Sequence, residues 1–234
     1  MKKHYIKRLF ATVAVLLCCI TANAHDFEVD GIYYNILSLE DLTVEVTYKG
    51  NNYDSFYNEY TGDVIIPSTV TYKSKSLTVT SIGDSAFEVC DGLTSITIGN
   101  SVTSIGDAAF FGCSGLTSIT IPNSVTGIDS DAFSGCSKIK KVELDCTTIG
   151  SWFSGKSSIE EIVLGDNVTR IGNSAFNGCS GITNISLKCT TPPTVGSKNF
   201  TNAHYINVTV CVPQGAIEAY QAADVWKEFW DIQE

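Results

Sequence analysis

Apolar residues recur along the middle of the chain at an interval of about 23 residues. The segment "VTSIGDAAFFGCSGLTSITIPNS" over residues 102–124 nearly copies "VTSIGDSAFEVCDGLTSITIGNS" over residues 79–101. In the second half of each copy the apolar residues follow the pattern L-x-x-I-x-I, and the β-branched composition predicts a short β-strand. A catalytic site is usually built once in a chain, so near-copies indicate a repeated architecture.

Five copies of this pattern align along the chain. Each has an isoleucine and a phenylalanine at fixed places, namely Ile82, Ile105, Ile128, Ile149 and Ile171, and Phe87, Phe110, Phe133, Phe153 and Phe176. The fourth copy is three residues shorter and has Trp152 where its neighbours have alanine. An incomplete copy precedes the five in "GDVIIPSTV", where Ile66 and Pro67 match Ile121 and Pro122.

A period in the twenties with this strand pattern is typical of a leucine-rich solenoid. One repeat buries too little apolar surface to fold alone, whereas stacked repeats place each Leu, Ile and Phe against its copy in the next coil. We therefore predict an α/β solenoid that is mostly β, a right-handed superhelix with five parallel strands about 4.8 Å apart. The "DAAFFGC" segment is expected to form a single turn of 3₁₀ or α structure.

The two ends of the chain depart from the repeat. Residues 25–78 predict an antiparallel β cap with the incomplete first repeat, in which "VTYKSKSLTVT" forms a small hairpin. Residues 79–190 hold the repeats, and residues 191–234 form a C-terminal cap whose last strand is "INVTVCVP". The segment from Pro213 onward predicts a helix with apolar side chains that cover the open core. These side chains are Ile217, Tyr220, Val225, Trp226 and Phe229.

The first 24 residues predict a secretory signal peptide. A basic head precedes an apolar run over residues 9–20, and the segment closes on Ala22-Asn23-Ala24. The run is shorter than the ~20 residues of a membrane span, and no second run of that length follows, so we expect no integral membrane segment after cleavage near Ala24. We therefore predict a secreted protein, in the periplasm, at the cell surface or outside the cell.

Removal of this leader makes the chain more acidic. It takes away four of the 15 basic residues and none of the 25 acidic residues, so the net formal charge changes from −10 to −14. An acidic surface repels phosphate backbones. Nucleic acid is therefore not an expected partner.

The repeat "VTSIGDAAFFGCSGLTSITIPNS" resembles the BspA-type leucine-rich repeat of bacterial surface proteins. The tail "TTPPTVGSKNF" with "VTVCVPQGAIEAYQAADVWKEFWDIQE" is similar to the C-terminal cap often found with it. The resemblance covers almost the whole chain after the leader. Members of that family with an assigned role are similar to adhesins, which bind host matrix proteins such as fibronectin and fibrinogen, or other cells. The short fourth repeat and the small number of repeats speak against a large multivalent adhesin.

Residues suited to catalysis are scarce. Outside the leader, histidine occurs only at His25 and His204, and an odd separation would put His204 and Cys211 on opposite faces of one strand. Asp84 and Asp107 precede the Ala-Phe pair of their repeats, where a carboxylate can accept backbone N–H groups at a turn. No paired carboxylates, zinc spacing or dense D-x-D-x-D string points to a site. We therefore predict no enzyme activity, no metal and no cofactor.

Polar strand residues that face away from the core form the main candidate binding site. Lys140 and Lys141 should lie beside Glu160 and Glu161 at its centre. Two interpretations stay open: cross-strand pairs that keep the sheet soluble, and a docking face for an extracellular or surface protein. The candidate residues are Thr94, Ser95, Thr97, Thr117, Ser118, Thr120, Lys140, Lys141, Glu143, Glu160, Glu161, Thr183, Asn184 and Ser186.

The best alternative binding site is the loop "NNYDSFYNEY", where Tyr53, Phe56, Tyr57 and Tyr60 cluster, and the other interpretation of these residues is a packed cap. A carbohydrate-binding or carbohydrate-active accessory protein is the alternative to a protein-binding function, and a structural spacer is a third. An aromatic platform on the sheet face would favour sugar, and that face has no aromatic residue.

Cysteine recurs at one repeat position, at Cys90, Cys113, Cys136 and Cys179, with Lys156 at this position in the short repeat. Identical positions point their side chains in parallel, whereas a disulfide needs Cβ atoms about 3.8 Å apart. We therefore predict a ladder of buried free thiols that act as small core residues. A disulfide between Cys189 and Cys211 in the cap stays open.

Overall fold

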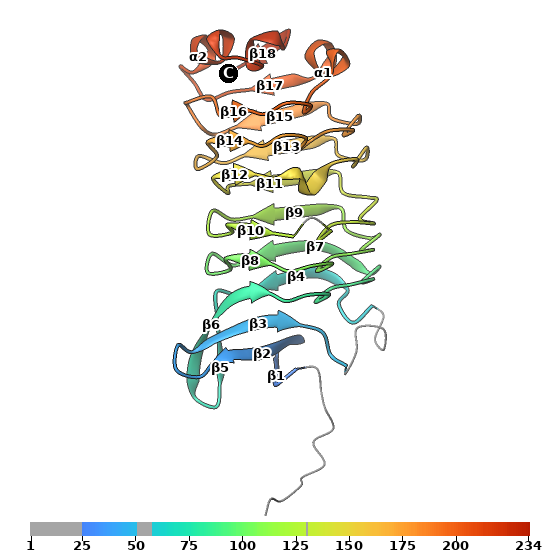
Figure 1. Cartoon of the computed structure of the whole chain (residues 1–234), viewed down its shortest axis with the longest axis vertical. Coiled ribbons are helices and arrows are strands. Elements are labelled where there is room, and N and C mark those ends of the chain that lie inside the picture. The colour runs from blue at the N-terminus through green and yellow to red at the C-terminus, as the bar shows by residue number, and fades with distance from the viewer. Residues whose placement is uncertain (1–24, 51–57, 130) are drawn as a thin grey trace, which may run out of the picture.

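The computed structural model describes residues 25–50, 58–129 and 131–234. The predicted signal peptide, residues 1–24, lies outside this description. Figure 1 shows the strands stacked along the long axis of the molecule, with the N-terminal strands at one end and the C-terminal helices at the other. Successive repeats thus follow one another in space in the order in which they occur in the sequence.

The largest sheet has eight strands, and every neighbouring pair in it is parallel. In chain order they are β4 (Gly62–Ile66), β7 (Leu93–Ile98), β9 (Ser118–Ile121), β11 (Lys141–Leu144), β13 (Glu161–Leu164), β15 (Asn184–Leu187), β17 (Thr209–Cys211) and β18 (Asp231–Gln233). The five strands that we predicted are β7, β9, β11, β13 and β15. The sheet is wider because the incomplete first repeat adds one strand and the C-terminal cap adds two, which gives further backbone groups hydrogen-bond partners.

A second layer contains β6 (Lys75–Ile82), which has eight residues, and five strands of two residues each. Three of these strands continue the sheet of the N-terminal cap, namely β6, β8 (Ser104–Ile105) and β10 (Gly127–Ile128). The other three form a separate sheet, namely β12 (Thr148–Ile149), β14 (Arg170–Ile171) and β16 (Thr194–Val195). The pairing breaks between β10 and β12, at the short fourth repeat. There the indole Nε1 of Trp152 donates to the carbonyl of Ile128 at 3.1 Å. In the preceding repeat the carbonyl of Ile105 accepts a backbone N–H, from Asp129.

The core contains a column of stacked phenylalanine rings. The ring centroids of Phe87 and Phe110 are 4.9 Å apart, and those of Phe110 and Phe133 are 5.3 Å apart, with interplanar angles of 7° and 8°. Phe153 continues the column at 5.3 Å from Phe133. All four side chains are fully buried. Burial of each ring depends on its neighbours in the stack, which is why one repeat cannot fold alone.

The repeated cysteines form the predicted ladder of buried free thiols. The thiols of Cys113, Cys136 and Cys179 donate to phenylalanine carbonyls of the preceding repeat at 2.9, 2.9 and 3.0 Å. Cys90 is also buried, and all seven cysteines of the described chain are free. In this position sulfur acts as a small apolar group with a weak S–H donor.

The N-terminal cap is antiparallel, as predicted. β1 (Phe27–Val29), β2 (Ile32–Ser38) and β3 (Thr43–Thr47) pair in sequence order. β5 (Thr69–Tyr72) forms the predicted hairpin with β6. β3 then pairs in parallel with β6, which continues into the first complete repeat. The boundary that we placed at residue 78 therefore falls inside a strand that both parts share.

The C-terminal cap differs from the single helix that we predicted after Pro213. The segment forms α2 (Ile217–Ala222), a 3₁₀ turn η3 (Trp226–Glu228) and strand β18. Val225 lies between these elements with φ +71°, in the left-handed region, which an α-helix does not contain. The chain then returns to the sheet, where β18 satisfies the backbone groups of β17.

The segment before the last two strands also contradicts the prediction. His204 lies in a helix, α1 (Asn202–Asn207), and not in one continuous strand with Cys211. The helix starts at a capping box in which the backbone N–H of Thr201 donates to Nδ1 of His204 at 3.1 Å. This local bond satisfies a backbone donor at the helix N-terminus, so it favours helix over strand.

Three of the five predicted covering residues are buried in the last coil, whereas Ile217 is half-buried against the core and Val225 is half-buried in a turn outside it. Tyr220, Trp226 and Phe229 are buried, and the Trp226 indole donates to the carbonyl of Pro193 at 2.8 Å. The cap contains no disulfide. The Cys189 thiol lies 3.3 Å from the Tyr220 hydroxyl inside the cap, whereas the Cys211 thiol is half-buried and faces the Asn184 amide on the sheet surface.

A further copy of the repeat, "VGSKNF", lies inside the cap at residues 195–200. Val195 of β16 is in register with Ile171 of β14, and the ring of Phe200 lies 6.3 Å from Phe176. Asn199 is buried, and its side-chain oxygen accepts the backbone N–H of Phe176 at 3.1 Å. In an inner repeat a backbone carbonyl accepts the equivalent N–H. We missed this copy because the Pro-Pro pair before it interrupts the pattern.

Candidate functional site

The exposed side chains of the eight-stranded sheet lie in rows that cross the strands. Ser95, Ser118, Lys141, Glu161 and Asn184 are direct neighbours in one row. A second row has threonine, glutamate and serine side chains on β7, β9, β11 and β15, and a third lies just before the strands. The structure leaves all fourteen predicted residues exposed or half-buried. Alternation places the first two rows on the face away from the core, whereas the residues of the third row directly precede the first row in the chain and are exposed where the strands begin.

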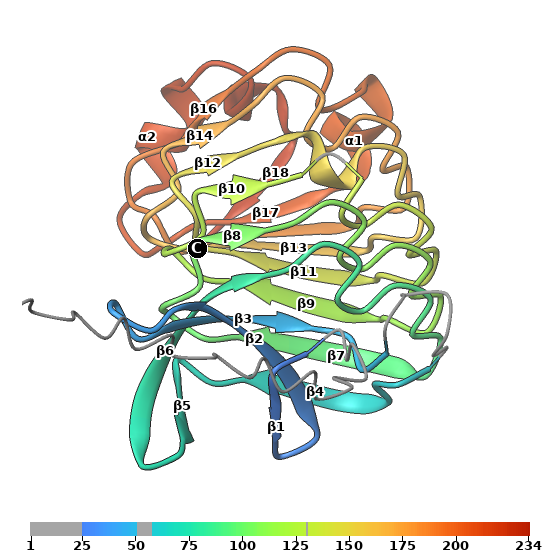
Figure 2. The same ribbon diagram turned by 60° about the horizontal axis from the view of Figure 1, so that its bottom comes forward.

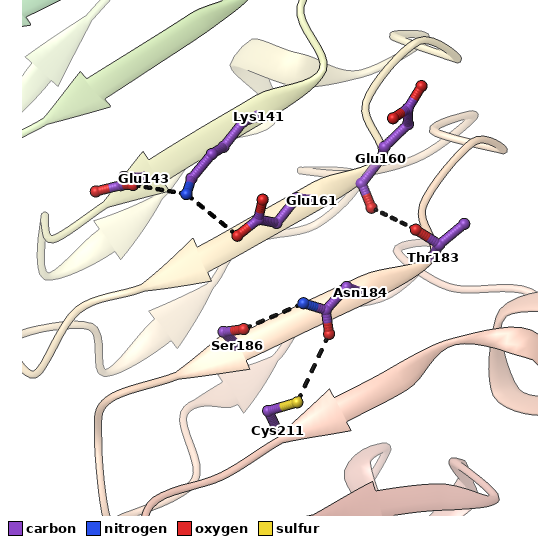
Figure 3. A network of polar contacts seen from close by, with 8 residues as sticks. All are labelled: Lys141, Glu143, Glu160, Glu161, Thr183, Asn184, Ser186 and Cys211. Atoms are coloured by element: carbon purple, nitrogen blue, oxygen red, sulfur yellow. Dashed lines mark hydrogen bonds and ion pairs between the residues drawn. The ribbon is translucent and has the colours of Figure 1, made fainter.

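The charged centre of this face is arranged as predicted. Lys140 pairs with Glu160 at 3.0 Å. The Lys141 amine lies between Glu143 and Glu161 at 3.1 and 3.2 Å (Figure 3). Hydrogen bonds to Glu143 and Glu161 raise the pKa of Lys141. Ion pairs this exposed contribute only about 0–1 kcal/mol each, so they organise the surface more than they stabilise the fold.

Hydroxyl groups cover the N-terminal half of the face. Thr94 and Ser95 both donate to Oδ1 of Asp63, each at 2.7 Å. These hydrogen bonds lower the pKa of Asp63. Thr117 donates to the carbonyl of Thr94 at 3.0 Å. The hydroxyls are therefore held in fixed positions across neighbouring strands.

An amide and a thiol lie beyond the charged centre. The amide of Asn184 donates to Ser186 Oγ at 3.3 Å and accepts from the Cys211 thiol at 3.7 Å, while the Thr183 hydroxyl donates to the Glu160 carbonyl at 3.2 Å (Figure 3). Each of these contacts stays on the outer face of the sheet.

The residues of this face that were missed in the sequence include Asp63, Thr209, Asp231 and Cys211. The match of Ile66 with Ile121 already placed Asp63 in the row of Ser118. Asp231 gave no such signal, because the segment around it was interpreted as helix. It accepts from the Thr209 hydroxyl at 2.7 Å. An aspartate therefore lies at each end of the row that contains Ser118 and Lys141.

A groove of about 330 Å³ opens where the strands of this face end. Thr120, Glu143 and Val163 line it from the face, and Asp145 and Asp166 line it from the following turns. Val163 is only 9% exposed because the side chains of neighbouring strands surround it. The face therefore continues into a concave, mainly acidic edge.

A family model described as "BspA type Leucine rich repeat region (6 copies)" matches residues 80–207, which is more than half of the chain. The chain belongs to this family. Its six copies exceed the five that we aligned. The comparison with curated proteins gives no match.

Solved bacterial leucine-rich repeat proteins are similar to this BspA-type chain. The T. pallidum leucine rich repeat protein has a TM-score of 0.52 and 21% identity, covering 80% of each chain. A leucine rich cell surface protein from Faecalibacterium prausnitzii A2-165 has a TM-score of 0.47 and 21% identity, covering 80% of this chain and 54% of that one. A leucine-rich repeat protein from Bacteroides ovatus ATCC 8483 has 0.33 and 22%, covering 89% and 76%. At such identities the T. pallidum likeness supports the fold alone.

The alternative loop before the BspA-type repeats is contradicted at one residue. Tyr60 is only 3% exposed, its hydroxyl donates to the Thr47 carbonyl at 2.6 Å and it accepts from the Tyr33 N–H at 3.1 Å. Its ring lies 4.4 Å from Phe87, so Tyr60 continues the phenylalanine column. The other members lie outside the described residues, namely Tyr53, Phe56 and Tyr57.

The remaining polar candidates have structural contacts in the BspA-type fold. Besides its bond to Thr201, His204 has Nε2 at 3.1 Å from the Cys179 carbonyl. Asp84 accepts the backbone N–H of Asp107 in the next repeat at 2.9 Å. Among the described residues, no group of three or more His, Cys, Asp and Glu side chains is placed to hold a metal ion. The helices of the described chain do not reach the length and hydropathy of a membrane span.

Proposed function

We propose that this chain is a secreted or cell-surface BspA-type repeat protein that binds another protein across the exposed face of its eight-stranded sheet. The observation that carries the proposal is the continuous row of polar side chains, which runs in register over eight parallel strands with three ion pairs at its centre. Leucine-rich repeats suit this role because stacking gives them an extended, rigid binding surface.

The chemistry of the face favours a protein over a sugar. Its fourteen proposed binding residues are hydroxyl, charged and amide side chains, and no aromatic ring is among them. Sugar rings usually stack on exposed aromatic rings, which this face lacks, whereas its charges and polar groups can give specificity towards a protein surface of complementary charge. Adhesion to host matrix proteins or to other cells is the biological setting that we propose for this binding.

The dimensions of the face limit the affinity. Eight strands about 4.8 Å apart make a face roughly 34 Å across the stack. Four residues of strand add about 13 Å in the other direction. This flat area of roughly 440 Å² is about half of the ~800 Å² that each partner buries in a standard interface. We therefore expect modest affinity, unless the partner also covers the groove at the strand ends.

A charge-swap variant tests the proposal. This variant combines Lys140→Glu, Lys141→Glu, Glu160→Lys and Glu161→Lys. It keeps the net charge and the cross-strand pairs, but it exchanges the positive and negative positions of each pair. Folding should be almost unchanged, because exposed pairs contribute little. The on-rate and salt dependence for a charged partner should change, because surface charge steers encounter. Pull-downs against host matrix proteins and whole cells supply the partner, and surface plasmon resonance measures the rates.

The control reverses charges far from the face. Lys75→Glu in the N-terminal hairpin and Lys227→Glu in the C-terminal cap change two exposed lysines. This variant should bind like the wild type. Unchanged binding by the charge-swap variant, with a partner that the wild type captures, would exclude the centre of the sheet as the binding site.

A further inference from the structure

We propose that the open edge of β4 and the cavity beside it bind an extended, basic segment of a protein partner, which adds a strand to the eight-stranded sheet. This site lies at the N-terminal end of the sheet and does not depend on the docking face proposed above. Three observations within the described residues support it: an unpaired strand edge, a cavity at that edge, and two buried polar atoms without partners.

The outer edge of β4 has free backbone groups. β4 is the last strand of its sheet, and no strand of residues 25–50, 58–129 or 131–234 pairs with its outer side. In later repeats the outward-facing residues direct their backbone groups to the preceding strand, as when the N–H of Lys141 donates to Thr117 at 3.2 Å. Asp63 and Ile65 occupy the same rows as Lys141 and Glu143. Because no strand of the described residues pairs with the outer side of β4, the N–H and C=O groups of Asp63 and Ile65 face the open edge.

A cavity of about 380 Å³ lies at this edge. Asp63, Val64 and Ile65 line it from β4, and residues 29–32 line it from the turn between β1 and β2. Figure 2 shows β4 at the margin of the sheet, near the β1–β2 hairpin. The Ile65 side chain is 69% exposed. Natural sheets rarely leave an aliphatic residue on an unpaired edge, because such an edge is a template for another strand.

Two residues that line the cavity each have a buried polar atom without a partner in the described chain. The atoms are the hydroxyl of Tyr34 and Oε1 of Glu59, both shielded from solvent. Tyr34 is fully buried. The other Glu59 oxygen accepts the backbone N–H of Lys49 at 2.7 Å. Tyr34 thus offers a donor and Glu59 an acceptor, and each peptide unit of an added strand carries the matching carbonyl and N–H.

The charge of the cavity selects a basic segment. Asp30, Glu59 and Asp63 line it, and among the described residues that line it there is no lysine or arginine. Burial raises the pKa of Glu59, since its charge is poorly solvated there. A lysine or arginine of the bound strand would supply the missing positive charge, and its aliphatic stem can cover Ile65.

A second copy of this chain is a poorer occupant of the same edge. Its complementary free edge would be β18, at the opposite end of the sheet. Asp231 of β18 belongs to the same row as Asp63. Joining the two ends would place these carboxylates side by side, which is destabilising. We therefore assign the edge to a different protein.

The probe for this site is a fluorescently labelled hexapeptide of alternating lysine and valine, KVKVKV, with EVEVEV as its acidic counterpart. Fluorescence anisotropy should show binding of the basic peptide and none of the acidic one. Two N-methylated forms of the basic peptide, one blocked at its lysines and one at its valines, test the geometry. Only one set of N–H groups faces β4, so one form should lose binding and the other should keep it.

Ile65 provides a matched pair of variants. Ile65→Pro removes the N–H at the open edge without removing a bond to β7, and it should weaken KVKVKV binding at least about tenfold. Ile65→Ser keeps the N–H and should bind more tightly than Ile65→Pro. Tyr34→Phe and Glu59→Gln should each weaken binding, and circular dichroism checks that every variant is folded.

Equal binding of the acidic and basic peptides would overturn the proposal, and so would unchanged binding by a folded Ile65→Pro variant. If that variant does not fold, the N-methylated peptides on the wild type decide, and equal behaviour of the two forms overturns it. Failure here is distinguishable from failure of the proposed function. The charge-swap variant could lose binding to its protein partner while the wild type does not bind KVKVKV. This combination would support the sheet face as a binding site and exclude the edge site.

Discussion

Two buried tyrosines of the N-terminal cap differ in their hydrogen bonding. The Tyr60 hydroxyl has two backbone partners, at Thr47 and Tyr33, whereas the Tyr34 hydroxyl has none in the described chain. Burial raises the pKa of Tyr34 well above its usual range, so the hydroxyl stays protonated and unsatisfied. Removing a satisfied hydroxyl leaves its buried partners without bonds, whereas removing an unsatisfied one does not.

Tyr60→Phe should therefore lower the free energy of unfolding by about 1–3 kcal/mol. Tyr34→Phe is the matched control, since it removes the same atom from the same cap, and it should leave the free energy unchanged or raise it. Urea denaturation at pH 7 measures both. Equal losses in the two variants would contradict the hydrogen-bond assignment.

Val89 is a second residue with a specific energetic consequence. It has φ +54°, in the left-handed region, and the other four repeats have glycine at the same place with φ between +71° and +79°. The left-handed conformation costs a residue other than glycine about 1–2 kcal/mol, and β-branched residues tolerate it least. Val89→Gly should stabilise the protein by about 1 kcal/mol. Val195→Gly, in extended strand β16, is the control and should destabilise it in the same urea titration.

At the scale of elements, the C-terminal cap depends on one buried indole. Trp226 is fully buried, and its ring packs against Tyr220, Phe200 and Phe229. Trp230, four residues later, is 78% exposed. Trp226→Ala should cost about 3–5 kcal/mol of unfolding free energy, and Trp230→Ala less than about 0.5 kcal/mol. Similar thermal shifts for the two variants would show that this segment does not cover the core.

Helix α1 makes the stability depend on pH. Burial lowers the pKa of His204 below its ordinary value of 6.5, against the smaller opposing effect of its bond to the Cys179 carbonyl. Below about pH 6.5, His204 therefore binds a proton more readily in the unfolded chain than in the folded chain. The free energy of unfolding thus falls as the pH falls toward the lowered pKa of His204. Urea denaturation between pH 7.5 and pH 5 should show this loss for the wild type. His204→Gln should show a shallower pH slope, although it is less stable at pH 7.5. Equal slopes would exclude His204 as the group that titrates.

At the scale of the whole molecule, the seven cysteines of the described chain form no disulfide, although the sequence predicts a secretory leader. Six of the seven thiols in the described chain are buried, and Cys211 is half-buried on the sheet face. Burial raises the pKa of Cys146 and Cys179 to about 11, which suppresses the reactive thiolate. Thiol titration without reductant should find at most one reactive group in the native protein and at least four in denaturant. Finding none or one in denaturant would contradict the ladder.

The repeat made much of the fold predictable from the sequence. Three predicted features depend on equivalent positions in adjacent coils. They are the strands of the five aligned copies, the buried thiols, and the pairing of Lys140 and Lys141 with Glu160 and Glu161. When one repeat stacks on the next, equivalent positions become neighbours. Alignment of the copies therefore predicts contacts as well as secondary structure, and the charged centre of the candidate face was predictable for this reason.

The ends of the stack were decided by the tertiary structure. Tyr60, Asn199 and the segment after Pro213 have no full set of copies to align with. Their places depend on which apolar surface and which backbone groups the last coils leave uncovered. The same reason explains β18. Its local sequence predicts a helix, but the segment forms a strand because it pairs with the free edge of β17. The repeat pattern in the sequence predicts the contacts that each repeat makes with its neighbours. An end coil lacks one neighbour, so its structure depends on which other segment covers its apolar surface and pairs with its backbone groups.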